Sequence, residues 1–268
     1  MMSLLMILAG AGAVAGFLAG LFGIGGGVIL VPALYHVFVA NGVAPDMATR
    51  LALGTSLAII LPTGFSSAFS HYKRDSVSRE AFLRLLPGVV AGALFGSVLA
   101  SHLNGVWLRG GFAFFLLGIA ALMLKGKKGI ALVQTLPTGL AAGSLGGGIG
   151  FVSALMGLGG GTLTVSTLAG CGFSLRVAVG TGAALGIAIA LPGALGFVFS
   201  GWGVGGLPEG ALGYVSLPAV LVVAPVSAFL APVGAAAAHR LPPLWHQRVF
   251  ALVLAGLALK MLATLPPG

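Results

Sequence analysis

The sequence predicts an all-α polytopic membrane protein, and three observations support this fold class. Only 6% of the 268 residues are charged and 58% are hydrophobic, whereas a soluble domain carries about 25% charged residues. Several apolar stretches reach the roughly 18 residues that suffice to cross about 30 Å of hydrocarbon. The pattern Gly-x-Gly-Gly-Gly occurs twice, at residues 23–27 and 157–161.

The two glycine clusters interrupt otherwise unbroken apolar sequence. Residues 16–27 and 150–161 match at a constant offset of 134, including the Gly-Phe pair and the apolar spacers. Glycine costs about 1 kcal/mol relative to alanine inside a helix, so a run of glycines is a poor helix interior. Each cluster is therefore expected to break a membrane helix.

The first half contains four predicted spans and one short piece. Residues 2–22 lack a basic leader region and are expected to be the first span rather than a signal peptide. A turn at 41–46 follows the short piece, and Asp46 is expected to cap the next helix. The spans and the piece, in chain order, are 2–22, the short piece 28–40, 47–71, 81–103 and 108–124.

The second half follows the same plan. A glycine-rich loop at 201–210 precedes a span with three prolines, Pro218, Pro225 and Pro232, which is expected to be kinked or split. The elements, in chain order, are a span at 135–156, a short piece at 162–171, and spans at 175–199, 211–238 and 245–264.

These matches predict two homologous repeats, 1–128 and 129–268, that form one transport domain with about eight full spans and two short half-helices. Further support comes from the motif Arg-x-x-x-Gly-Thr, which begins at Arg50 and again at Arg176. If the short pieces complete a crossing, the repeats are inverted and ten of the 13 basic residues face the cytoplasm. If the short pieces instead re-enter the membrane and return to the same side, the repeats are parallel and only eight of the basic residues face the cytoplasm. The positive-inside rule thus favours inverted repeats.

A helix broken at mid-membrane presents backbone N–H groups without intrahelical partners. Such breaks are tolerated where they line a cavity, and the helix N-terminus there favours an anion. The glycines expected to bind a small anion are Gly25, Gly26, Gly27, Gly159, Gly160 and Gly161. The alternative is that the glycines only allow close helix packing, as in the Gly-x-x-x-Gly spacing of Gly12 and Gly16.

Two arginines and three hydroxyl residues complete the candidate substrate site. Guanidinium groups suit oxyanions, which makes Arg50 and Arg176 candidates, although arginines near a membrane interface also snorkel without a binding role. Thr55, Ser56 and Thr181 lie about one turn further along the same predicted helices than the two arginines. Their hydroxyls could bind substrate oxygens, or bond to the carbonyl one turn back.

Other classes of chemistry find little support in the sequence. The single cysteine excludes an intramolecular disulfide, and the four acidic residues all fall in or beside predicted loops. No catalytic constellation, metal-ligand spacing or phosphate-binding loop is visible, so no catalytic residue, metal or cofactor is expected. The net charge of +9 reflects cytoplasmic loops rather than nucleic-acid binding.

His71 is a candidate for proton coupling, or an interfacial histidine without a role.

The glycine clusters, Val31-Pro32, residues 52–57 and residues 178–181 together resemble the sulfite exporter TauE/SafE family of membrane transporters. The resemblance covers roughly residues 5–265. It implies export of a small sulfur oxyanion or organosulfonate across the plasma membrane of a prokaryote. Ser166 stands where the first half has Pro32, and Gly182 follows Thr181 where a serine is usual, so the two sides of the pocket differ.

The function expected is secondary transport of a small sulfur-containing anion by a multi-pass plasma-membrane protein, with no enzymatic activity. The alternatives are an importer or channel for thiosulfate or another small anion, and a membrane scaffold in which the glycines only pack. The expected partners are this anion and the lipid bilayer, with no nucleic acid. A homodimer is a candidate assembly, but the sequence does not fix it.

Overall fold

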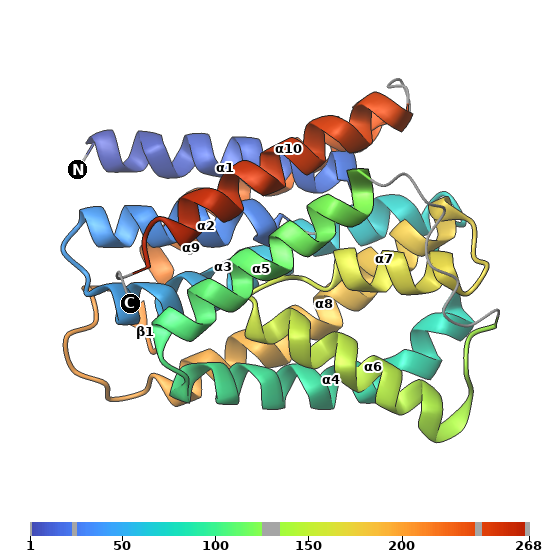
Figure 1. Cartoon of the computed structure of the whole chain (residues 1–268), viewed down its shortest axis with the longest axis horizontal. Coiled ribbons are helices and arrows are strands. Elements are labelled where there is room, and N and C mark those ends of the chain that lie inside the picture. Colours follow the sequence, from blue (N-terminus) through green and yellow to red (C-terminus); the bar gives the residue numbers. More distant parts are fainter. Residues whose placement is uncertain (1, 23–25, 125–134, 239–242, 266–268) are drawn as a thin grey trace.

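The computed structural model describes residues 2–22, 26–124, 135–238 and 243–265 (Figure 1). The boundary between the two predicted repeats lies outside these residues. Within them the chain forms ten helices: α1 (Met2–Phe22), α2 (Gly27–Ala40), α3 (Pro45–Tyr72), α4 (Arg79–His102), α5 (Gly105–Leu124), α6 (Gly139–Leu155), α7 (Gly161–Gly170), α8 (Leu175–Ser200), α9 (Leu217–Ala238) and α10 (Pro243–Leu262).

One predicted boundary is wrong. The span expected from residue 211 begins only at Leu217, because the chain first forms a small antiparallel hairpin from β1 (Ala211–Leu212) and β2 (Val215–Ser216). Gly213 provides the positive φ of 55° between the strands. The backbone N–H of Tyr214 then donates to the carbonyl of Phe197 on α8. From Leu217 onwards α9 is one continuous helix with Pro225 and Pro232 inside it, so of the expected kink or split the split does not occur.

Helices α3 and α8 form the antiparallel centre of the bundle. Gly54, near the start of α3, lies against Phe197 near the end of α8, and Gly180, near the start of α8, lies against Ser76 just beyond α3. In an 18-residue apolar window of each helix, 61% of the residues of α3 and 56% of those of α8 are buried, against 28% for α4 and 33% for residues 217–234 of α9. The loop before α3 and the hairpin therefore lie at one end of the molecule, and the loop before α8 lies at the other (Figure 1).

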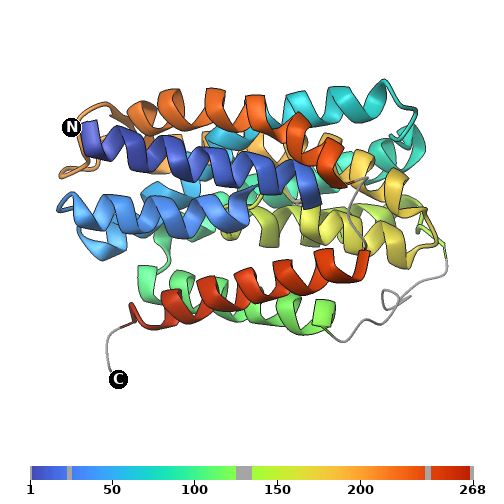
Figure 2. The ribbon, with the colours of Figure 1, turned by 90° about the horizontal axis from the view of Figure 1, so that it is seen from above.

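Glycines bring two outer helix pairs into backbone contact. A Cβ added at Gly88 or Gly92 of α4 would overlap the carbonyl oxygens of Gly143 or Gly147 of α6. Likewise, a Cβ at Gly16 of α1 would overlap the carbonyl of Ser227 on α9. Small residues at such spacing let membrane helices approach closely. Figure 2 shows α1 beside α9 along most of its length, with α10 beside α5.

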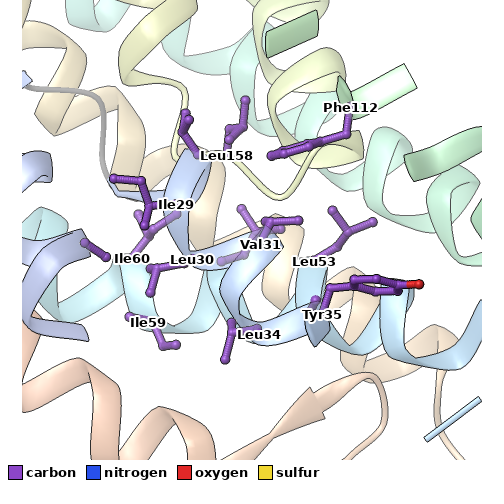
Figure 3. Close-up of a cluster of buried hydrophobic side chains, with 14 of the residues drawn as sticks. Ile29, Leu30, Val31, Leu34, Tyr35, Leu53, Ile59, Ile60, Phe112 and Leu158 are labelled. Carbon is purple, nitrogen blue, oxygen red and sulfur yellow. The ribbon is translucent and has the colours of Figure 1, made fainter. Parts of the chain in front are cut away.

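The main core lies where α2 crosses α3. Side chains from both helices meet there with Phe112 of α5 and Leu158 of the segment between α6 and α7 (Figure 3). Leu158 and Ile60 are each 1% exposed. The short helix α2 is therefore held by packing on several sides, although it is only 14 residues long.

The described residues include four helices long and apolar enough to cross a membrane: α3, α4, α8 and residues 217–234 of α9. The outward surface carries large apolar side chains, including Phe65, Trp107, Phe114 and Phe229, each more than half exposed. Soluble monomers rarely expose contiguous apolar surface of this kind. The chain is a multi-pass membrane protein.

Candidate functional site

The second glycine cluster forms a complete helix break. Helix α6 ends in a Schellman motif, in which Leu158 N–H donates to the carbonyl of Ser153 at 2.7 Å and Gly157 N–H donates to that of Ala154 at 3.0 Å. Gly157 has a φ of 65° and Gly160, the N-cap of α7, has a φ of 68°. Both positions therefore require the left-handed backbone that glycine adopts without strain.

The first cluster has the same conformation at its described end. Gly26 is the N-cap of α2 and has a φ of 73°. The carbonyl of Gly26 accepts the backbone N–H groups of Ile29 and Leu30, each at 3.0 Å. Gly25, one of the glycines expected to bind substrate, lies outside the described residues.

The two clusters meet in the interior of the bundle. A Cβ added at Gly27 would lie 2.7 Å from the carbonyl oxygen of Gly157 and 3.1 Å from the Cα of Leu158. The hydroxyl of Ser56 on α3 donates to the same Gly157 carbonyl at 2.9 Å. Glycine at position 27 is thus required for close approach, and Ser56 fixes the second break against α3.

A small pocket opens beside the second break. It leaves about 20 Å³ of free space for water-sized molecules, whereas one water needs roughly 10–15 Å³ by this measure. A polyatomic anion therefore requires the pocket to widen. The lining residues come from α1, α3, α8, α9 and the break itself: Ala19, Ile60, Thr63, Gly64, Ser67, Gly159, Gly161, Gly182, Ala183, Gly186 and Ala231.

The electrostatics of the pocket come from backbone rather than from charged side chains. None of its lining residues is ionisable. Helix α7 begins at Gly161, which lines the pocket, so the positive end of the α7 dipole lies at the pocket wall. A helix N-terminus with free N–H groups favours an anion over a cation.

Thr55 and Thr181 have partners within the protein. The Oγ1 of Thr55 accepts the backbone N–H of Ser216, and that of Thr181 accepts the backbone N–H of Ser78, both at 2.9 Å. Both threonines are fully buried, and neither lines the pocket. Their hydroxyl oxygens join helices, and a substrate role for them stays a prediction.

Arg50 lies near the end of the bundle rather than at the pocket. Its guanidinium donates to the carboxylate of Asp46 at 2.8 Å and to the carbonyl of Leu103 at 3.1 Å. Thr63, which lines the pocket, lies about 20 Å further along α3 at roughly 1.5 Å per residue.

Asp46 has a different capping role from the one expected. The N-cap of α3 is Ala44, with Pro45 as the first residue of the helix. The carboxylate of Asp46 instead accepts the backbone N–H of Gly105, at the start of α5, and pairs with Arg50. It therefore ties the starts of two helices together.

Arg176 and His71 lie at the opposite end from Arg50. Arg176 is exposed in the first turn of α8. His71 is near the end of α3, where its Cβ would be 3.2 Å from a Cβ added at Gly180. The two arginines are thus not brought together, and neither they nor His71 line the pocket.

Several residues of the site are not indicated by the motifs. Thr63, Gly182 and Gly186 line the pocket, and the Gly-x-x-x-Gly spacing of the last two is the only sequence signal for them. Arg109 of α5, which the motifs do not indicate either, lies near the start of α3 rather than at the pocket. It is 3% exposed, donates to the carbonyl of Pro45 and the hydroxyl of Thr49, and lies 5.3 Å from the ring of Tyr35.

Comparison with known proteins places this chain in a family. The sequence model of the family described as "Sulfite exporter TauE/SafE" matches residues 8–261. A "Probable membrane transporter protein" of Haemophilus influenzae is 34% identical over 250 residues, covering 93% of this chain and 95% of that protein. The "Probable membrane transporter protein MJ0441" of Methanocaldococcus jannaschii is 28% identical, covering 82% and 81%. No solved structure matches. The chain belongs to the sulfite exporter TauE/SafE family.

Proposed function

We propose that the protein is a secondary transporter that exports a small sulfur-containing anion, such as sulfite or an organosulfonate, across the plasma membrane. The observation that carries the proposal is the meeting of the two glycine breaks, Gly27 against Gly157, beside a pocket without charged side chains. Related proteins of Haemophilus influenzae and Bacillus subtilis are named probable membrane transporters. The sulfur-containing substrate rests on the family description.

The backbone of the break supplies the binding chemistry. Free N–H groups in the first turn of α7 and the positive end of its dipole attract an anion without a fixed cation. A neutral pocket also lets the anion leave, because no ion pair must be broken. In this conformation the pocket has room for only about one water molecule. The transport cycle therefore includes a widening of the space between α3, α7 and α8.

The protein is proposed to alternate access by moving two inverted halves against each other. Three relationships support inversion. Helices α3 and α8 are antiparallel. Thr55 of the first half bonds Ser216 of the second, and Thr181 of the second bonds Ser78 of the first. Inverted repeats around a mid-membrane site are a common plan of secondary transporters.

The charged candidates take positions along the pathway rather than in the pocket. Arg176, exposed at one end, would attract the anion to that mouth of the pathway, since a surface of one sign of charge concentrates the opposite ion. Arg50, at the other end, is paired with Asp46. His71 shares the end of Arg176 and is proposed to respond to pH there. No step of this scheme makes or breaks a covalent bond.

Flux in proteoliposomes tests the proposal. Purified protein would be reconstituted and loaded with radiolabelled sulfite, taurine, sulfoacetate, thiosulfate or sulfate, with and without a pH gradient. The proposal predicts saturable movement of at least one sulfur oxyanion. Current that is driven by voltage without saturation would indicate a channel. Well-folded protein that moves none of these solutes would contradict the proposal and favour a scaffold.

A further inference from the structure

Three buried hydroxyls flank the second break without a hydrogen-bond partner among the described residues. They belong to Ser153, Thr162 and Thr164, which are 0%, 9% and 0% exposed. Buried hydroxyls in folded proteins are nearly always paired, so three unpaired ones within twelve residues of chain need an explanation.

The three residues do not line the pocket in this conformation, but each lies next to the second break or to a residue of the pocket wall. The Oγ of Ser153 lies 3.6 Å from the place of a Cβ at Gly160, the N-cap of α7. Thr162 directly follows Gly161, which lines the pocket. The Cβ of Thr164 lies 3.7 Å from the place of a Cβ at Gly182, another lining residue.

The corresponding positions of the first break carry no hydroxyl. At the offset of 134 that aligns the two clusters, Ser153, Thr162 and Thr164 correspond to Ala19, Val28 and Leu30. These three side chains are apolar and between 1% and 5% exposed. The two breaks therefore share their backbone conformation at the N-cap but differ in the side chains around it.

We propose that the anion subsite is formed by the second break alone. In it the hydroxyls of Ser153, Thr162 and Thr164, together with the start of α7, bind a singly charged oxyanion. The proposal rests on the transport function above and specifies its site. Each hydroxyl would donate to an oxygen of the anion once the pocket widens.

The preference for a single charge follows from what surrounds the pocket. A helix N-terminus supplies about half an elementary charge, and no lining residue is cationic. A second negative charge would be desolvated without compensation, and isolated buried charges are costly. Organosulfonates and hydrogensulfite fit this description better than the sulfate dianion.

Binding to the full chain in lipid nanodiscs tests this inference by calorimetry. The probes are methanesulfonate, a monoanion at neutral pH, and sulfate, a dianion of similar shape. The variants Thr162→Val and Thr164→Val keep side-chain volume and remove one hydroxyl each. Thr164→Ser keeps the hydroxyl. Ser166→Ala is the matched control, because Ser166 lies on α7 but is exposed and bonded to the carbonyl of Thr162.

The expected result is that wild-type protein binds methanesulfonate more tightly than sulfate. Each valine variant should raise the Kd for methanesulfonate roughly tenfold or more, since hydrogen bonds to charged groups are strong. The melting temperature of the empty valine variants should be unchanged or higher, because the removed hydroxyl has no partner. Thr164→Ser and Ser166→Ala should bind like the wild type.

Three results would overturn the inference in different ways. If the wild type binds methanesulfonate but both valine variants bind it equally well, the subsite lies elsewhere while the transport proposal stands. If the valine variants have a lower melting temperature but an unchanged affinity for methanesulfonate, the hydroxyls stabilise the fold and do not bind the anion. If the wild type binds no sulfur oxyanion at all, the transport proposal itself fails, and the subsite with it.

Discussion

The side chain of Thr181 on α8 accepts a hydrogen bond from the backbone N–H of Ser78, with 2.9 Å between the two atoms. Ser78 is itself the N-cap of α4, and its hydroxyl accepts the N–H of Ala81. On the other side of the bundle Thr55 accepts the N–H of Ser216, whose hydroxyl accepts the N–H of Ala219 at the start of α9. The central helices α8 and α3 thus each accept a hydrogen bond from the residue just before an outer helix, α4 or α9 respectively.

These contacts predict a structural role for both threonines. Thr55→Val and Thr181→Val should each lower the free energy of unfolding by about 1–3 kcal/mol, because each leaves a backbone N–H unpaired. Thr55→Ser and Thr181→Ser keep the acceptor and serve as controls. Thermal unfolding in detergent measures the effect. Valine variants that are fully stable but lose substrate affinity would instead support the substrate-binding role that the sequence predicts.

The contact between α4 and α6 predicts a strong dependence on one glycine. Gly92→Ala should destabilise the protein by about 1–3 kcal/mol, because the new Cβ would overlap the carbonyl of Gly147 and force the helices apart. Gly118→Ala on α5 is the control, since nothing lies within 4 Å of its Cβ position. The control should be neutral or stabilising by up to about 1 kcal/mol. Equal melting temperatures for both variants would contradict the packing described here.

The two arginines are expected to differ in their effect on stability. Arg50→Ala removes the hydrogen bonds to Asp46 and to the carbonyl of Leu103, and should cost about 1 kcal/mol. Arg176→Ala changes an exposed residue and should leave the melting temperature unchanged. If Arg176 attracts anions to one mouth of the pathway, its variant should raise KM for flux and leave kcat unchanged. That rise in KM should disappear at high salt.

Much of the fold could be predicted from the sequence, because glycine and hydrophobicity act locally. Runs of apolar residues that stop at glycines predict the first span. The same runs predict the short helix that follows each glycine cluster. Helices α1 and α7 begin or end within one residue of the predicted boundaries. The hairpin before α9 was missed because Ala211–Ser216 is apolar enough to continue a helix. Its strand pairing and the contact of Tyr214 with α8 are tertiary effects.

The candidate site was harder to predict. Arginine and threonine are typical anion ligands, but Arg50 and Thr55 are bound to groups of the protein itself, and no local pattern reveals such distant partners. Gly159 and Gly161 line the pocket, and their role in substrate binding stays a prediction. Their neighbours Gly182 and Gly186 come from another helix, so only folding brings them there. The hydroxyls of Thr162 and Thr164 are visible in the sequence as differences from Val28 and Leu30 at the aligned positions of the first cluster.

A small sulfur oxyanion is proposed to pass through the pocket beside the second break. Ala183 lines this pocket, so Ala183→Leu should fill it, while Ala91→Leu adds the same volume on the exposed face of α4. The decisive measurement is counterflow of radiolabelled sulfite in proteoliposomes that contain wild type or either variant. Saturable counterflow is expected for wild type and Ala91→Leu, and none for folded Ala183→Leu. Counterflow by Ala183→Leu at the wild-type rate would contradict this proposal.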